Sequence, residues 1–289
     1  MLWRFASAST QGRAHVDSGL PCQDSSHCIL LADSQAEPIL VAAISDGAGS
    51  AARSEIGSRM ACTSFTDAIT ALIRNRGAAA PLERAEIESW LAEFGREASR
   101  QAEELGISVR DLACTLVAAV VTPAWSAFCQ VGDGGMVVNG SAGDDNSGAG
   151  PKFELVFWPE LAQYANETYF ITATDAADHL QFRVHRCRVR EIVLFSDGLQ
   201  RLVLNFETRE AFIPFFDRML EPVRKTTERA GEVEELSRQL ASYLGSATIT
   251  ERTDDDVSLI LATCEEPTNP APTSGPRSDA SAREGDADA

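Results

Sequence analysis

The sequence VAAISDG, residues 41–47, is an apolar run that closes on a serine, an aspartate and a glycine. A nearly identical stretch, IVLFSDG, occupies residues 192–198. A short apolar run that stops at a turn dipeptide predicts a buried strand with the aspartate at its end. Asp46 and Asp197 are therefore expected at the ends of two strands that lie far apart in the chain.

Around these two stretches, strands and helices are predicted in blocks. Strands at 2–9, 28–32 and 39–45 precede two amphipathic helices at 56–76 and 81–105, which Gly77 and Gly106 end. The later elements are strands at 113–122, 126–131, 135–139, 153–158, 167–173, 182–189 and 192–196, helices at 207–220 and 233–244, and a strand at 257–262. This order lacks regular βαβ alternation, so it favours α+β layers over a doubly wound parallel sheet.

Composition limits the partners of the folded body. The 289 residues are 44% hydrophobic and carry a net charge of −18. Such a surface repels nucleic-acid phosphates and anionic lipids, so neither nucleic acid nor a membrane is an expected partner. The excess of carboxylates suits the binding of cations instead. No apolar run has the length of a membrane helix, and the seven cysteines form no C-x-x-C pair. We therefore expect a cytoplasmic protein with reduced thiols. The sequence leaves its oligomeric state open, and a monomer is one of the states it allows.

Two segments fall outside the expected body. Residues 140–150 have the composition of a flexible hairpin insertion, and residues 265–289 form an acidic, Pro-rich tail that we expect to be disordered. Residues 1–264 are expected to form one domain.

Two further aspartates resemble Asp46 and Asp197 in context: Asp133 in VGDG at 131–134, and the acids of DDDV at 254–257. A single Asp-Gly pair is an ordinary turn former. A set of aspartates at strand ends, three of them followed by glycine, instead suits a centre for hard cations, because magnesium and manganese prefer carboxylate, carbonyl and water oxygens.

Six motifs in order resemble those of the PP2C-type (PPM) family of metal-dependent serine/threonine protein phosphatases. They are GLPCQD (19–24), SDGAG (45–49), LACTL (112–116), VGDG (131–134), FSDGL (195–199) and DDVS (255–258). The resemblance covers about residues 1–262. It implies a four-layer α-β-β-α sandwich with two central antiparallel sheets, and a binuclear magnesium or manganese centre at one end of them.

The resemblance also assigns roles to single residues. Asp46 matches the carboxylate that bridges both metals, and Gly47 would offer its carbonyl to one of them. Asp197 and Asp255 match the remaining ligands of the second metal. Asp24 would orient a metal-bound water, and Asp133 matches the acid that helps to hold a third, weaker ion in relatives.

The last motif allows two registers, because three acids follow one another. Where relatives commonly read Asp-Asn-Val-Thr, this chain reads DDVS at 255–258. That alignment puts Asp255 on the metal, with Asp256 as its neighbour and Asp254 in solvent.

The chain departs from the family pattern in two places. Many relatives carry an arginine shortly before the first motif aspartate to grip the phosphate, whereas this chain reads GRAHVDSG at 12–19. His15 or Arg13 could do that work. Relatives often have a histidine after the second motif's Asp-Gly, where this chain has Ala48.

The expected function is hydrolysis of phosphoserine and phosphothreonine in proteins by a water activated at the metal centre. The substrates would be phosphoproteins made by a serine/threonine kinase. Two alternatives stay open: a catalytically weak module that binds phosphoproteins, and a phosphohydrolase of small molecules.

Overall fold

The computed structural model describes residues 2–32, 37–140, 153–159 and 168–265. The predicted insertion at 140–150 and the predicted tail at 265–289 lie outside the described residues, apart from Gly140 and Glu265. None of the described helices is both long enough and apolar enough to cross a membrane.

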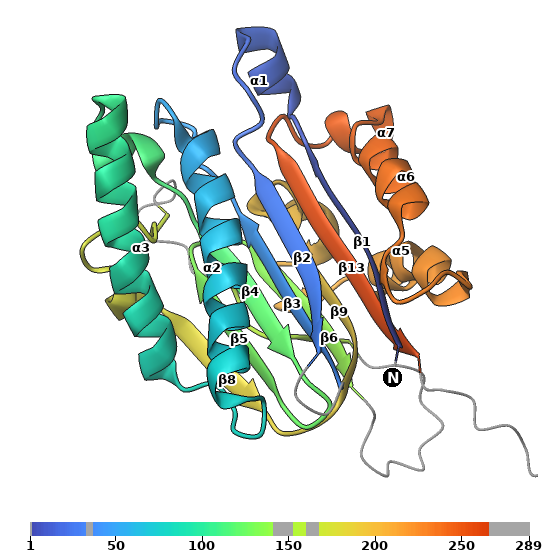
Figure 1. Cartoon of the computed structure of the whole chain (residues 1–289). Coiled ribbons are helices and arrows are strands. Elements are labelled where there is room, and N and C mark those ends of the chain that lie inside the picture. The colour runs from blue at the N-terminus through green and yellow to red at the C-terminus, as the bar shows by residue number, and fades with distance from the viewer. Residues whose placement is uncertain (1, 33–36, 141–152, 160–167, 266–289) are drawn as a thin grey trace, which may run out of the picture.

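Two β-sheets pack face to face at the centre of the molecule (Figure 1). In spatial order, the first sheet contains β12 (Gly231–Glu232), β1 (Leu2–Thr10), β13 (Val257–Glu265), β9 (Val189–Phe195), β6 (Gly135–Gly140) and β7 (Phe153–Leu155). The second contains β2 (Ser25–Ala32), β3 (Pro38–Ser45), β4 (Leu116–Val121), β5 (Ser126–Val131) and β8 (Gln181–His185). Neighbouring strands run antiparallel, except that β12 is parallel to β1.

Helices cover the outer face of each sheet. The long helices α2 (Ser54–Arg76) and α3 (Arg84–Leu105) lie on the five-stranded sheet, while α5 (Ile213–Lys225) and α6 (Glu234–Leu244) lie on the six-stranded one (Figure 1). Three of the described α-helices are short, namely α1 (Arg13–Ser18), α4 (Gln200–Val203) and α7 (Ala247–Thr250). The layers follow the order α-β-β-α, which confirms the predicted fold class.

Three apolar cores hold these four layers together. The core under α2 and α3 includes Phe65 and Trp90, whose rings meet edge to face at 5.2 Å. Between the sheets lie residues such as Phe128 and Leu194, and Phe216 of α5 lies in the third core. Full burial of one such side chain contributes about 1.5–3 kcal/mol to the stability of the fold. The cores therefore hold the two sheets, and with them the ends of their strands, in fixed positions.

The helix boundaries follow the expected signals. Gly77 and Gly106 end α2 and α3, as predicted, and Gly106 adopts a left-handed φ of 66°. Glu83 and Glu86 form a reciprocal capping box at the start of α3.

Two element predictions are wrong. The predicted strand at 167–173 is not a strand in its described part; Ile171 makes one backbone bond to Cys114, and the chain then turns at 171–175. The predicted helix at 207–220 begins only at Ile213, because residues 204–211 form the hairpin of β10 (Leu204–Asn205) and β11 (Glu210–Ala211). Helix α1 was not predicted.

Strand register brings the motif aspartates to one end of the sandwich. Ser25 at the start of β2 pairs with Ser45 at the end of β3, and β5 ends at Val131, opposite Leu116. In the other sheet, Phe195 at the end of β9 pairs with Leu259, near the start of β13. The acids that flank these positions therefore converge from both sheets.

Candidate metal centre

Three aspartates from three strand ends meet in one cluster. Asp46 follows β3, Asp133 follows β5, and Asp197 follows β9. Each offers one carboxylate oxygen, and these oxygens lie within 4.8 Å of one another. All three residues are partly buried, so the cluster faces solvent from a recessed position.

The serine before each repeated Asp-Gly pair ties its strand to a neighbour. Ser45 Oγ donates to the carbonyl of Thr115 at 2.6 Å, and the Asp46 N–H donates to Thr115 Oγ1 at 3.0 Å. In the other sheet, Ser196 Oγ accepts from the Ser258 N–H at 2.9 Å. These bonds fix the backbone of Asp46 and Asp197, which explains why serine occupies both positions.

Residues outside the six motifs hold Asp133. Thr168 donates its hydroxyl to Oδ2 of Asp133, and the Gln200 amide donates to the Asp133 carbonyl. Gln130 donates to the carbonyls of Gly132 and Gly134 on either side. Their sequence positions carry no motif signal, so sequence reasoning missed Thr168 and Gln200.

The cluster has more negative charge than its surroundings satisfy. Both oxygens of Asp24, Oδ1 of Asp133 and Oδ1 of Asp197 are buried and accept no hydrogen bond from the described residues. No lysine or arginine in that part of the chain forms an ion pair with these aspartates. Buried anionic oxygens without donors are costly unless a cation meets them.

The pKa values of these carboxyl groups reflect the same imbalance. Burial raises the pKa of Asp24 to about 7 and, together with the charges of Asp133 and Asp255, raises the pKa of Asp197 to about 8. Burial and the charges of Asp24 and Asp197 raise the pKa of Asp46 well above its usual range. Hard divalent cations fit such a donor set, because they stabilise the ionised form of every member.

Asp24 and Gly47 lie directly beside the cluster. Asp24 is only 7% exposed, and its charge acts on Asp46. The Gly47 N–H donates to the Gln23 carbonyl at 3.2 Å, and a Cβ at this position would lie 2.7 Å from Cβ of Ser54. Glycine at 47 therefore allows the backbone to pass close to Ser54 and to the Gln23 carbonyl.

Asp255 lies beside the cluster rather than within it. The residue is exposed, but neighbouring protein removes part of its hydration, and this desolvation together with the charge of Asp256 raises its pKa. Its charge acts on both Asp46 and Asp197. The group of carboxylate oxygens within 4.8 Å of one another does not include Asp255.

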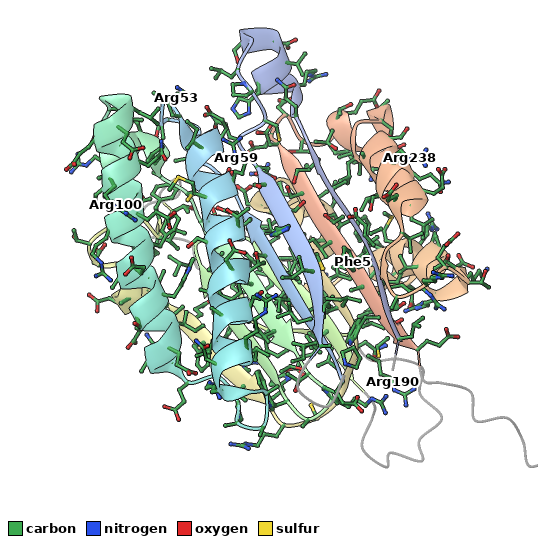
Figure 2. All side chains as sticks on the ribbon, in the orientation of Figure 1. Phe5, Arg53, Arg59, Arg100, Arg190 and Arg238 are labelled. Atoms are coloured by element: carbon green, nitrogen blue, oxygen red, sulfur yellow. The ribbon has the colours of Figure 1, made fainter. Side chains whose placement is uncertain are left out.

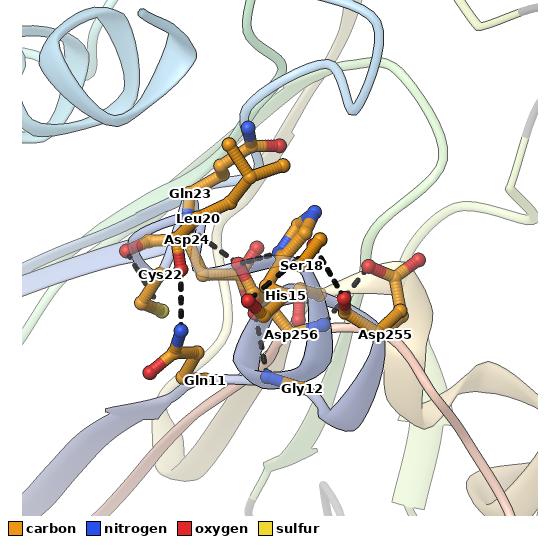
Figure 3. A network of polar contacts seen from close by, with 12 residues as sticks. Gln11, Gly12, His15, Ser18, Leu20, Cys22, Gln23, Asp24, Asp255 and Asp256 are labelled. Atoms are coloured by element: carbon orange, nitrogen blue, oxygen red, sulfur yellow. Dashed lines mark hydrogen bonds and ion pairs between the residues drawn. The ribbon is translucent and has the colours of Figure 1, made fainter.

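Asp256 is the buried member of the three consecutive acids, and Figure 3 shows its contacts with Gly12, Gln23 and His15. Its two oxygens accept from the N–H groups of Gly12 at 2.6 Å and Gln23 at 2.5 Å, and Nδ1 of His15 lies 3.0 Å from Oδ2. A Cβ on Gly12 would lie 2.2 Å from the carbonyl carbon of Asp255, so only glycine fits there. Asp256 therefore joins helix α1 to the start of β13.

The two candidates for gripping phosphate have carboxylate partners of their own. His15 faces Asp256, with its side chain 13% exposed, and Arg13 pairs with Asp254 at 2.8 Å on the surface. Other cationic residues lie at the same end of the molecule as α1, namely the exposed Arg53 and Arg59 (Figure 2). Arg53 pairs with Glu55 at 2.8 Å.

Comparison with known proteins gives one family. A family model described as protein phosphatase 2C matches residues 11–245. Over 262 residues the chain is 30% identical to serine/threonine-protein phosphatase 3 of Escherichia coli (strain K12). The match covers 91% of this chain and 98% of that protein.

Solved structures show the same fold at low sequence identity. The catalytic domain of the serine/threonine protein phosphatase PstP, in complex with two manganese ions, gives a TM-score of 0.53 at 16% identity, over 91% of this chain and 98% of that one. The serine/threonine phosphatase Stp1 from Staphylococcus aureus gives a TM-score of 0.50 at 16% identity, over 92% and 96%.

Proposed function

Because the chain belongs to the protein phosphatase 2C family and is a serine/threonine protein phosphatase, we propose that its aspartate cluster is a binuclear magnesium or manganese centre. Asp46 would bridge the two ions, Gly47 would add its carbonyl, and Asp197 and Asp255 would complete the second site. Asp133 would help to hold a third, weaker ion. The buried carboxylate oxygens without hydrogen-bond donors carry this proposal.

The chemistry divides between the cations and the chain. Bound cations would neutralise the phosphate ester and lower the pKa of a water molecule that attacks phosphorus. Asp24, buried beside Asp46, would accept a hydrogen bond from that water and so orient it. The Ser45 and Ser196 hydrogen bonds keep the strand ends in place while the substrate binds.

A thiol nucleophile does not fit this site. Burial and the charges of Asp256 and Asp24 raise the pKa of Cys22, the thiol nearest to Asp24 in the chain, and burial raises that of Cys114 to about 12. The thiolate is the reactive form of cysteine, and it is suppressed at both positions. Direct attack by water needs neither of them.

The substrates are phosphoserine and phosphothreonine residues of proteins that a serine/threonine kinase has modified. The net charge of −18 does not prevent their approach, because the bound cations and the exposed Arg59 would supply positive charge at the end of the molecule where the phosphate binds.

The proposal is tested by phosphate release from a phosphothreonine peptide with manganese or magnesium, with and without a chelator. We expect turnover that the chelator removes and that falls at least about 100-fold in Asp46→Asn and Asp197→Asn. Asp254→Asn, an exposed acid at the same end, is the matched control and should retain the wild-type rate.

Other outcomes separate the alternatives. Peptide binding without metal-dependent release would favour a binding module, and faster turnover of nucleotides than of phosphopeptides would favour a small-molecule phosphohydrolase. Full activity of Asp46→Asn would refute the metal centre itself.

A further inference from the structure

A cavity of about 720 Å³ opens at one edge of the sandwich, apart from the aspartate cluster. Its walls include Phe157, Trp158, Pro159, Gln181, Arg183 and Arg209. Strand β7 ends one sheet and strand β8 ends the other, so the cavity lies where the two sheets stop facing each other.

Alternation along β8 explains which side chains reach this cavity. Phe182 and Val184 pack into the core under α2 and α3. Gln181 and Arg183 therefore face the opposite way, toward the other sheet. There, Arg183 lies over the Phe157 ring, 5.2 Å from its centroid, and pairs with Glu154 of β7 at 3.5 Å.

The β10–β11 hairpin supplies a second stacked arginine. The guanidinium carbon of Arg209 lies 5.1 Å from the centroid of the Trp158 ring, and Phe206 of the same hairpin meets that ring edge to face at 5.3 Å. Arg209 has a φ of 56°, a left-handed conformation that costs energy in a residue other than glycine. It forms no ion pair with a carboxylate in the part of the chain that the structure describes.

Two arginines in one cavity are notable in a chain with a net charge of −18. Stacking on an aromatic ring orients the guanidinium plane and reduces the entropy lost when it binds an anion. A carboxylate fits the donor geometry of such a guanidinium.

The cavity lies within peptide reach of the aspartate cluster. Gln181 pairs with Gln130, which is three residues before Asp133 and binds the carbonyls on either side of it. Strand β5 ends at Val131 and the chain bends at Gly132, so these three residues span at most roughly 10 Å. An extended peptide covers the same distance in about three to five residues.

We propose that this cavity is a docking site for an acidic residue of the phosphoprotein substrate, with Arg209 and Arg183 as its anion-binding groups. The proposal rests on the proposed function. It implies that the enzyme prefers phosphorylated sites with an aspartate or glutamate about three to five residues from the phosphorylated residue.

The test uses phosphothreonine peptides in which one glutamate moves through positions −5 to +5 of a neutral sequence. We expect wild-type kcat/KM to rise about tenfold when the glutamate occupies a preferred position. Arg209→Glu and Arg183→Glu should abolish this preference through KM, and the milder Arg209→Gln should reduce it. Arg186→Glu, which makes the same charge change at an exposed position after β8, is the control and should retain it.

Two further measurements separate this proposal from the proposed function. p-Nitrophenyl phosphate is too small to reach the cavity, so its hydrolysis should be the same in all four variants and reports the metal centre alone. Binding of labelled peptides in chelator reports the cavity without turnover. Equal kcat/KM and equal binding for all glutamate positions, or a preference that persists in Arg209→Glu and Arg183→Glu, would overturn the docking site while leaving the phosphatase assignment intact.

Discussion

At the residue scale, Asp254, Asp255 and Asp256 show how three identical side chains differ through their surroundings. Asp254 pairs with Arg13 in solvent, with the two side chains 66% and 56% exposed. Asp255 lies at the rim of the cluster, and Asp256 is 1% exposed and holds two backbone N–H groups. Each position therefore predicts a different effect of mutation.

Asp256→Ala should lower the free energy of unfolding by about 2–4 kcal/mol, because it leaves the N–H groups of Gly12 and Gln23 buried without an acceptor. Asp254→Ala should change it by less than about 0.5 kcal/mol, since exposed ion pairs contribute little. Urea unfolding of both variants, in chelator to remove metal binding, measures the difference. Equal losses in the two variants would contradict the structural role of Asp256.

The sequence could predict much of the site but not the role of Asp256. The repeated Ser-Asp-Gly pattern and the motif order single out Asp46 and Asp197, and the structure brings both together with Asp133. The partners of Asp256 lie more than 230 residues earlier in the chain. No local pattern encodes such a contact, and for the same reason His15 was considered for phosphate rather than for Asp256.

At the element scale, α5 is attached to its sheet by an apolar face and by a charged contact between Arg224 and Glu191. Glu191 of β9 is 8% exposed and accepts two hydrogen bonds from Arg224 of α5, at 2.5 and 2.8 Å, and one from Asn139 at 2.7 Å. Around this contact, Phe216, Leu220 and Val223 of α5 pack into the apolar core. The helix thus combines an apolar face with a partly buried arginine that pairs with Glu191 and with Asp217.

Arg224→Met should reduce the free energy of unfolding by about 3 kcal/mol, because it leaves the Glu191 carboxylate buried without its cation. Lys225→Met is the neighbouring control and should have no measurable effect, since Lys225 pairs with Glu221 in solvent. Urea unfolding measures both. If Glu191→Gln added to Arg224→Met restored none of the lost stability, the unpaired charge would not be its cause.

The elements that were mispredicted share a physical reason. Residues 207–212 (ETREAF) contain no glycine, proline, asparagine or aspartate to mark a turn. The hairpin to which they belong contacts Trp158, from another part of the chain, through Phe206 and Arg209. In residues 168–173, the Thr168 hydroxyl donates to the Asp133 carboxylate, and the Ile171 N–H donates to the carbonyl of Cys114, just before β4. Local periodicity cannot reveal such distant contacts, whereas α2 and α3, with their long periodic faces and glycine ends, were predicted closely.

At the scale of the whole molecule, packing two sheets face to face gathers carboxylates that repel one another. The fold forces Asp24, Asp46, Asp133 and Asp197 into one recess, where burial raises all four pKa values. The metal-free protein therefore carries a destabilising charge that bound cations would relieve. Stability should then depend on pH and on metal together.

The sign of that dependence follows from the raised pKa values. Unfolded aspartates titrate near 3.9, whereas in the folded chain the pKa of Asp24 is about 7 and that of Asp197 about 8. Between about pH 4 and pH 8 the folded state therefore binds more protons than the unfolded state. The contribution of these groups to the free energy of unfolding is fully present below about pH 4 and is lost as the pH rises toward 8.

In chelator, we therefore expect Tm to fall by roughly 5 °C or more between pH 5 and pH 8, and to fall less in Asp197→Asn, which cannot ionise at that position. Saturating manganese should raise Tm more at pH 8 than at pH 5, because its ligands must be deprotonated to bind it. Thermal unfolding of wild type and Asp197→Asn, at both pH values with and without metal, gives all the comparisons. Asp254→Asn controls for removal of an exposed charge. Equal pH slopes in wild type and Asp197→Asn, with no gain from manganese, would show that the clustered carboxylates neither strain the fold nor hold a cation.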